Sequence, residues 1–326
     1  MSQPMAYWSI SSQVLKEEAE KLGLHVEILV PEKNLFLVSS TEKEVVFKST
    51  DFGGNSSLGK KIVDDKELTY TLLNRYNIPI PKTAYIYENE FGQFDWTKLA
   101  DFRFPVIIKP LNEAHGNGVC MNITTIPELQ KKLEISFGSY AKMIIQEQVV
   151  GDECRVLVVL GEVVVAYNRV PPSVTGNGHS TVHQLIEYEN QNNPLRQEDY
   201  CAPLSFIRED QELFDYVGKQ GYTMNDVLRQ GIELQLRGNS NMGTGGTARD
   251  KTYILHQEIR DLCVDIAEKL HLSICGVDIL TTDFSRPLHE TGGVILEVNG
   301  TPGIGGDREL TSVNSGREML KKLFNL

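Results

Sequence analysis

The sequence is poor in cysteine, in long apolar runs and in positive charge, and each shortage excludes a class of protein. Its five cysteines include no CxxC pair and are odd in number, which favours reduced thiols over a disulfide framework or a zinc site. No apolar run approaches the roughly 18 residues of a membrane span. The N-terminal segment also lacks the charged start and apolar stretch of a signal peptide. We therefore expect a cytoplasmic protein with no membrane partner.

Negative charge dominates the composition. The chain carries 44 acidic residues against 32 lysines and arginines, a formal net charge of −12. General binding to nucleic acid depends on clustered cations that neutralise phosphates, so no nucleic-acid partner is expected. A local basic pocket for a phosphorylated ligand remains compatible with this balance. The length of 326 residues exceeds the usual size of one domain, so two or three packed subdomains are expected.

Hydrophobic periodicity predicts a chain that mixes helices and strands. The first elements expected are a serine-capped helix over residues 11–22 and strands over 25–30, 34–40 and 44–50. The next segment, 51–65, is rich in Gly, Ser and charge and is predicted to be a loop. The middle of the chain is predicted to hold a helix over 66–77, strands over 83–89, 104–112, 119–125 and 142–150, and a helix over 127–137.

The remainder of the chain is predicted to start with a β-hairpin. The hairpin joins strands over 154–161 and 162–170 through a tight turn at Gly161. A polar, Asn- and Gln-rich stretch over 187–197 then interrupts the pattern. The elements expected after it are a helical segment around 209–233, an amphipathic helix over 256–272, and strands over 274–283 and 292–300.

Two strands near the C-terminus carry polar side chains among apolar ones. The strand that opens with Ile295 and Leu296 is expected to place Glu297 and Asn299 on its opposite face, just before a Thr-Pro-Gly turn. Asp278 stands alone in the preceding apolar strand, where an unpaired carboxylate is costly and a divalent cation would compensate it. Carboxylate and amide oxygens are ligands that Mg²⁺ prefers. The sequence favours a magnesium site here over the alternative, a pair of solvated acids.

Two lysines and a glycine-rich segment are candidates for phosphate binding. Lys109 ends an apolar strand, where burial without an anion is costly, and the His-Gly-Asn-Gly stretch at 115–118 offers unobstructed backbone N–H groups. A plain β-turn is the alternative for these glycines. Lys66 begins a predicted helix and is either a surface lysine or a second phosphate contact. Arg169 and Arg237 are the better anion-binding candidates among the arginines, because each closes an apolar strand.

Six blocks of the sequence, taken in order, resemble an ATP-grasp carboxylate–amine ligase. The blocks are DDKELTYTLLNRYNIPIP, FPVIIKPLNEAHGNGV, IIQEQVVGDECRVLVV, RVPPSVTGNGHSTVHQLIEYENQNNPLR, LRGNSNMGTGGTARD, and GVDIL with ILEVNGTPGI. Within that superfamily the chain most resembles the ATP-grasp portions of cyanophycin synthetase and of bifunctional glutathione synthetase. The resemblance implies an ATP-grasp fold of the α+β or α/β class. A small N-terminal α/β domain at 1–62 would precede two subdomains, at 63–145 and 146–326, that sandwich the nucleotide.

The resemblance also implies roles for residues by position. Those implied to bind ATP are Lys66, Lys109, His115, Gly116, Gly118, Glu147, Val149 and Glu153, the last through ribose. The implied ligands of Mg²⁺, with Mn²⁺ as the alternative ion, are Asp278, Glu297 and Asn299. The residues implied to hold the phosphoryl group and the acyl substrate are Arg169, Arg237 and Asn239. The hinge departs from the relatives at Gln146 and Gln148, where an acid and then an aromatic are common.

The implied activity is ATP-dependent amide formation. A carboxylate of an amino acid or small peptide would attack the γ-phosphate, and an amine would then displace phosphate from the acyl phosphate, giving a peptide or γ-glutamyl-type bond and ADP. Such a site aligns charges and needs no protein nucleophile. Two alternatives stay open: an ATP-grasp phosphotransferase or ligase of another carboxylate, and a nucleotide-binding regulatory protein without catalysis. Amino acids or peptides are the expected substrates, and a homodimer is a family-level expectation.

Overall fold

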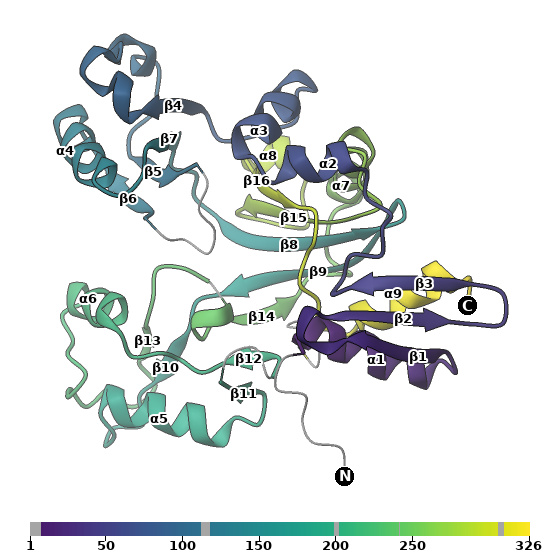
Figure 1. Ribbon diagram of the computed structural model, residues 1–326. Coiled ribbons are helices and arrows are strands. Elements are labelled where there is room, and N and C mark those ends of the chain that lie inside the picture. The colour runs from purple at the N-terminus through teal and green to yellow at the C-terminus, as the bar shows by residue number, and fades with distance from the viewer. Residues whose placement is uncertain (1–7, 112–117, 199–201, 241, 306–309) are drawn as a thin grey trace.

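The computed structural model describes residues 8–111, 118–198, 202–240, 242–305 and 310–326. Antiparallel sheets of three, four and five strands form its framework (Figure 1). Two small strand pairs accompany them, an antiparallel one between β10 (Ser173–Thr175) and β13 (Glu233–Gln235) and a parallel one between β11 (Arg196–Gln197) and β12 (Leu204–Ser205).

The three-stranded sheet belongs to the N-terminal unit, and its predicted elements are confirmed. They are α1 (Ile10–Lys21), β1 (His25–Val30), β2 (Leu35–Ser39) and β3 (Glu44–Lys48), with the 3-10 turn η1 (Pro31–Lys33) between the first two strands. Ser9 caps α1 by accepting from the N–H of Ser12. The prediction of a loop over 51–65 is wrong, because Ser56 caps a further helix, α2 (Ser57–Val63).

The four-stranded sheet has the strand order β4-β7-β5-β6 and contains every strand predicted for the middle of the chain. Its elements are α3 (Lys66–Arg75), β4 (Thr83–Tyr87), η2 (Glu88–Gln93), η3 (Trp96–Leu99), β5 (Val106–Pro110), β6 (Cys120–Ile123), α4 (Ile126–Phe137) and β7 (Lys142–Glu147). Ile108 on one face of this sheet packs against Leu129 and Leu133 of α4. The opposite face of the sheet carries Lys109, one of the candidate phosphate-binding residues.

The five-stranded sheet has the strand order β14-β9-β8-β15-β16. Its strands are β8 (Asp152–Val159), β9 (Glu162–Val170), β14 (Thr247–Asp250), β15 (Ile274–Thr281) and β16 (Val294–Asn299). The predicted β8–β9 hairpin is confirmed, and positive φ angles of 49° at Leu160 and 79° at Gly161 give its turn the twist that suits a two-residue hairpin loop.

The two faces of the five-stranded sheet have different neighbours. One face packs against α7 (Gln257–Lys269), the predicted amphipathic helix, through Ile259, Cys263 and Ile266. The other face contributes Leu157 and Ile274 to a core shared with the N-terminal unit. Toward the far end of these same strands that face becomes polar, and the candidate site lies there.

Two predictions for the region between β10 and β13 are wrong. The polar stretch over 187–197 does not interrupt the structure, because α5 (Val182–Asn192) runs through it from a capping box of Thr181 and Gln184. The helix expected around 209–233 is only α6 (Gln211–Lys219). Positive φ angles at Gly221 and Gly231 then turn the chain toward β13.

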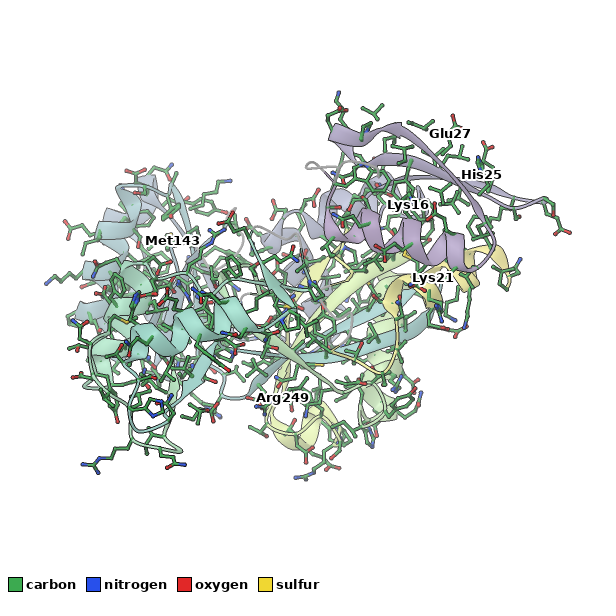
Figure 2. All side chains as sticks on the ribbon, turned by 90° about the horizontal axis from the view of Figure 1, so that it is seen from below. Lys16, Lys21, His25, Glu27, Met143 and Arg249 are labelled. Atoms are coloured by element: carbon green, nitrogen blue, oxygen red, sulfur yellow. The ribbon has the colours of Figure 1, made fainter. Side chains whose placement is uncertain are left out.

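Two helices near the C-terminus were not predicted. They are α8 (Leu288–Thr291) and α9 (Ser315–Phe324), and η4 (Met242–Thr244) is a further short turn. Figure 2 shows α1, with Lys16 and Lys21 labelled, beside α9 at the end of the molecule opposite Met143. The four cysteines within the described ranges are free thiols. In those same ranges no helix combines the length and apolarity that crossing a bilayer requires.

Candidate functional site

A β-bulge at Leu296 decides which side chains of β16 face the site. Strict alternation would place Ile295 on the same face as Glu297. The register instead pairs Ile279 with Ile295 and Asp278 with Glu297, so Leu296 is the extra residue of a bulge. Ile295 therefore joins the apolar core, and Glu297 lies directly across from Asp278 on the polar face.

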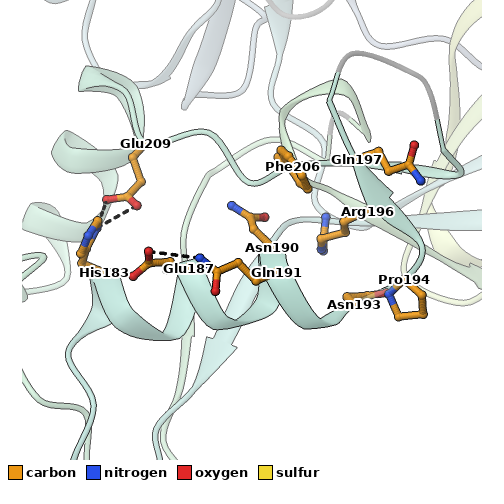
Figure 3. Close-up of a pocket in the computed structure, with 10 residues that line it drawn as sticks. All are labelled: His183, Glu187, Asn190, Gln191, Asn193, Pro194, Arg196, Gln197, Phe206 and Glu209. Carbon is orange, nitrogen blue, oxygen red and sulfur yellow. Dashed lines mark hydrogen bonds and ion pairs between the residues drawn. The ribbon is translucent and has the colours of Figure 1, made fainter.

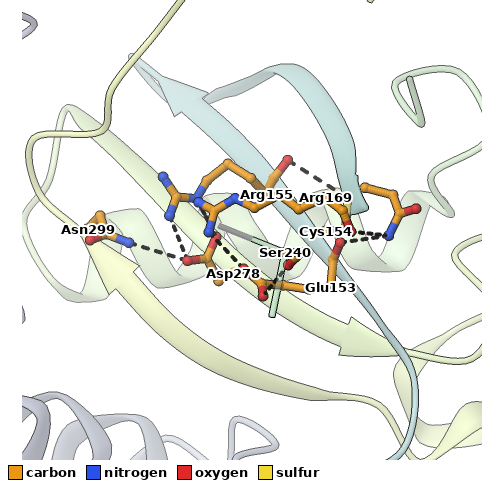
Figure 4. Close-up of polar contacts among 8 residues, drawn as sticks. Glu153, Cys154, Arg155, Arg169, Ser240, Asp278 and Asn299 are labelled. Carbon is orange, nitrogen blue, oxygen red and sulfur yellow. Dashed lines mark hydrogen bonds and ion pairs between the residues drawn. The ribbon is translucent and has the colours of Figure 1, made fainter. Parts of the chain in front are cut away.

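Asp278 lies at the centre of a buried polar cluster (Figure 4). Arg155, directly opposite on β8, donates from Nε to Oδ1 and from Nη2 to Oδ2, the second contact measuring 2.6 Å. Arg169 Nη2 lies 3.6 Å from Oδ1, and Asn299 Nδ2 lies 3.4 Å from Oδ2. Asp278 is 2% exposed and Arg155 9%, so this is a paired charge in the interior.

The charge on Asp278 is set by two opposing effects. Burial alone would raise the pKa of this carboxyl, because a poorly solvated site favours the neutral form. The positive charges of Arg155 and Arg169, with the hydrogen bonds from Arg155, outweigh burial and hold the pKa below its ordinary value. Asp278 is therefore a carboxylate at neutral pH, as a metal ligand must be.

Among the arginines near predicted strand ends, the sequence favoured Arg169 and Arg237 over Arg155, although a signal for Arg155 was present. A lone arginine within the apolar stretch CRVLVV is as costly to bury as a lone aspartate within CGVDIL. Its position also depends on Gly276, because a Cβ there would lie 2.8 Å from Cδ of Arg155 and 3.1 Å from Cβ of Pro302. The absence of a side chain at Gly276 thus leaves space for the Arg155 guanidinium to reach Asp278.

Glu153 and Arg169 extend the cluster along the strand ends. Arg169 Nη1 donates to Glu153 Oε1 at 2.8 Å, and the Ser240 hydroxyl contacts Oε2 at 3.2 Å. Burial and the charge of Asp278 raise the pKa of Glu153, although the two nearby arginines oppose this. The residue expected at ribose therefore meets a residue expected at the phosphoryl group within one network.

The other two residues expected at the acyl substrate are held by α6. Arg237 is fully buried and donates to Asp210 Oδ2 at 2.6 Å and to Glu212 Oε2 at 3.1 Å. Asn239 donates to Glu212 Oε1 at 2.9 Å. A ligand would reach the Arg237 guanidinium only if these contacts opened.

Lys109 is connected to β16 through Tyr70 of α3. Its Nζ lies 3.1 Å from the Tyr70 hydroxyl and 5.4 Å from the centroid of the ring. The same hydroxyl donates to the carbonyl of Leu296, the bulge residue. Lys66 begins α3 four residues earlier and so lies on the same helix face as Tyr70. Of the two candidate phosphate lysines, Lys66 therefore lies on α3 and Lys109 contacts α3. Through Tyr70, this helix also contacts the strand that carries Glu297.

The predicted hinge lines a cavity of about 380 Å³, whose wall includes Glu147 and Val149. The Glu147 side chain accepts from the backbone N–H of Arg103 at 2.9 Å. Of the glycine-loop residues, His115 and Gly116 lie outside the described residues. Gly118 has φ of +70° and no space for a Cβ beside Pro110.

A larger cavity of about 780 Å³ lies on α5 and contains none of the predicted site residues (Figure 3). Most of its lining residues are polar or charged, among them His183, whose Nδ1 contacts the Glu209 carboxylate at 2.8 and 2.9 Å. That carboxylate raises the pKa of the imidazole.

The donor set at the strand ends fits a hard divalent cation. Asp278, Glu297 and Asn299 supply two carboxylates and one amide oxygen, the ligand types that such an ion takes, and a bound ion would share the Asp278 oxygens with Arg155, Arg169 and Asn299. Among the described residues no group of three or more His, Cys, Asp or Glu side chains could hold a metal. Ligand phosphates and water would therefore have to complete the coordination.

Comparison with known proteins identifies relatives of this chain. The model of the RimK-like ATP-grasp domain matches residues 63–185 and 223–323. Cyanophycin synthetase of Nostoc sp. is 36% identical over 297 residues, which span 90% of this chain and 32% of that protein. The glutathione biosynthesis bifunctional protein GshAB of Clostridium perfringens is 30% identical, over 97% of this chain and 41% of that protein. The match thus covers 32% of the length of the first relative and 41% of the length of the second.

A solved structure supports the same grouping at the level of the fold. The bifunctional glutathione synthetase of Pasteurella multocida superposes with a TM-score of 0.76 at 24% identity, over 98% of this chain and 44% of that one. This similarity and the family match confirm the ATP-grasp fold expected from the sequence.

Proposed function

Because the chain belongs to the RimK-like ATP-grasp family, we propose that it is an ATP-dependent ligase that joins a carboxylate to an amine. The carboxylate would come from an amino acid or a small peptide, and the product would be an amide, ADP and phosphate. The observation that carries the proposal is the placement of Asp278, Glu297 and Asn299 on one sheet face, with Lys109 linked to their strand through Tyr70. Cations and metal ligands converge there as phosphoryl transfer requires.

Each group has a distinct task in this reaction. Lys66 and Lys109 neutralise the ATP phosphates, and Glu147, Val149 and Glu153 hold the nucleoside. Asp278, Glu297 and Asn299 hold Mg²⁺, or Mn²⁺ in its place, and the ion supplies charge neutralisation at the transferred phosphate when bound. Arg169 and Arg237, with Asn239, steady the phosphoryl group and the acyl carboxylate.

The reaction is tested by asking whether an oxygen atom of the substrate carboxylate appears in the released phosphate. Amino acids are first screened singly and in pairs for ADP release, and products are identified by mass. The substrate is then labelled with ¹⁸O in its carboxylate. Attack on the γ-phosphate places one carboxylate oxygen between carbon and phosphorus, and amine attack on the acyl carbon expels that oxygen with phosphate. We expect ¹⁸O in the released phosphate, and unlabelled phosphate alongside amide product would reject the acyl phosphate.

The site assignment is tested by Glu297→Gln, which removes the charge and keeps the shape. We expect ligation to fall by about 10²- to 10³-fold, because charge stabilisation at the transferred phosphate is lost. The matched control is Glu290→Gln, an exposed glutamate of α8 that pairs with Arg286 at 2.9 Å. Equal rates for the Glu297 variant and the wild type would show that the metal ligands lie elsewhere.

A further inference from the structure

The segment that follows β16 leaves the site along the N-terminal unit. We call residues 300–305 the exit segment. It begins directly after Asn299 and belongs to no strand of the described structure. Pro302 packs over Gly276 and so lies close to Arg155 and the polar cluster.

Three buried side chains of the N-terminal unit hold the carbonyl groups of the exit segment. Each of them donates to one carbonyl of the segment, and together they hold every second carbonyl along it. The bonds run from Asn55 Nδ2 to Gly300 O at 2.7 Å, from Thr50 Oγ1 to Pro302 O at 2.8 Å, and from Ser11 Oγ to Ile304 O at 3.0 Å. The three donors are at most 7% exposed. Buried carbonyls need partners, and here side chains supply them in place of a neighbouring strand.

The spacing of these bonds determines the register of the exit segment. Along the exit segment, carbonyls that these side chains hold alternate with carbonyls that they do not hold. The three held residues are buried, and the residues between them, Thr301 and Gly303, are exposed. A slide of one residue would therefore turn all three carbonyls away from their donors.

One of these side chains, Asn55, also couples the exit segment to the strand that carries Asp278. The side-chain oxygen of Asn55 accepts from the backbone N–H groups of Ser273 and Ile274 at 2.7 and 2.9 Å, while its nitrogen holds Gly300. At the other end Gly305, with φ of +96°, packs on α1, where a Cβ would lie 2.8 Å from Val14. The donors all precede residue 63, where the family match begins, so the family match does not account for them.

We propose that Ser11, Thr50 and Asn55 are positioning residues that hold the exit segment in the register from which Asn299 meets the metal. The N-terminal unit is then part of the ligation site and not a separate module. This inference rests on the proposed function for its meaning, since Asn299 is a metal ligand only under that proposal.

The test uses Thr50→Val, which removes the hydroxyl without changing the shape of a side chain that is 1% exposed. Amide hydrogen exchange over 299–305 is measured without ligand, and Mn²⁺ binding is measured with ADP present. We expect exchange to quicken and Mn²⁺ affinity to fall, each by about tenfold. Thr50→Ser keeps the hydroxyl and should stay within about twofold of the wild type.

The matched control is Thr69→Val, because Thr69 is also a buried threonine whose hydroxyl donates to a carbonyl outside the exit segment, that of Ile62 at 2.8 Å. If Thr50→Val exchanges at the wild-type rate, or if Thr69→Val reproduces its effects, the proposal is wrong. Should Thr50→Val fail to fold, Ser11→Ala is measured in its place against Ser12→Ala on the same helix.

Failure of this inference differs from failure of the proposed function. The exchange measurement uses no substrate, so faster exchange in Thr50→Val establishes the hold on the exit segment even if no ligation is found. Conversely, ¹⁸O transfer with unchanged exchange would leave the ligase proposal intact and remove the positioning role.

Discussion

At the scale of single residues, the site depends on one position where the chain has no side chain. Gly276 lies between Arg155 and Pro302, and any Cβ there would come within 3.1 Å of both. A glycine in an apolar strand usually weakens it, and here it is the condition under which an arginine reaches across to Asp278. The paired charges are stable because each removes the cost of burying the other.

We predict that Gly276→Ala pushes the Arg155 side chain away from Asp278. Overpacking should lower the free energy of unfolding by about 1–3 kcal/mol, and Mn²⁺ binding should weaken. Urea denaturation and Mn²⁺ titration check this. Gly218→Ala in α6 is the control, because its Cβ meets nothing within 4 Å, and it should be as stable as the wild type or more so. If Gly276→Ala were as stable as the wild type, Arg155 and Pro302 would have moved away from the new Cβ without any loss in the free energy of unfolding, and the prediction would be wrong.

At the scale of elements, the bulge in β16 connects both halves of the site. It turns Glu297 toward Asp278, and its carbonyl, that of Leu296, accepts from the Tyr70 hydroxyl on α3. Tyr70 in turn contacts Lys109 of β5. The Tyr70 hydroxyl therefore connects a helix with two strands that belong to different sheets. Tyr70 itself is buried, with 2% of its surface exposed.

We predict that Tyr70→Phe weakens ATP binding while leaving the ring in place. Both the Leu296 carbonyl and the Lys109 ammonium lose a buried partner, so the free energy of unfolding should fall by about 1–2 kcal/mol and the Kd for ATP should rise about three- to tenfold. Calorimetric titration with ATP measures the second effect. Tyr87→Phe removes a comparable hydroxyl bonded to Glu67 at 2.9 Å. If both variants bind ATP equally, the link through Tyr70 has no role in binding.

At the scale of the whole molecule, the first and last helices of the described structure are packed together. Helix α9 lies against α1 beside the three-stranded sheet (Figure 2), and Phe36, Leu15 and Leu320 share one core. Glu18 of α1 is 2% exposed and receives Arg317 Nε of α9 at 2.7 Å and Lys21 Nζ at 2.7 Å. This packing keeps the N-terminal unit against the exit segment.

We predict that Arg317→Ala destabilises the protein in a pH-dependent way. Burial raises the pKa of Glu18, but hydrogen bonds and charges of Lys21 and Arg317 outweigh it, so the pKa is lowered on folding. A carboxyl with a lowered folded pKa stabilises the fold above its ordinary pKa and loses this contribution as the pH falls. The variant should lose about 1–2 kcal/mol at pH 7, because Lys21 still pairs with Glu18.

The loss should shrink between about pH 5 and pH 3, where carboxyls protonate. Urea denaturation of wild type and variant across this range measures it. Arg286→Ala breaks the exposed pair that Arg286, just before α8, makes with Glu290 of that helix, and it should change the free energy of unfolding by less than about 1 kcal/mol at every pH. A deficit that stays constant down to pH 3 would assign the effect of Arg317 to packing and not to charge.

Sequence reasoning alone reached the fold, and it proposed most residues of the candidate site, because strands, helices and out-of-place polar residues leave local signals. Periodicity of two or of 3.6 residues marks strands and helices, and polar residues such as Asp278 and Lys109 are conspicuous in apolar strands. Blocks in a set order then indicated the ATP-grasp family. The pairing of residues across the structure left no such local signal: register places Arg155 opposite Asp278 and the bulge places Ile295 in the core, and packing of α3 brings Tyr70 to Lys109. The hold of Ser11, Thr50 and Asn55 on the exit segment joins residues more than 200 positions apart, and only tertiary packing decides it.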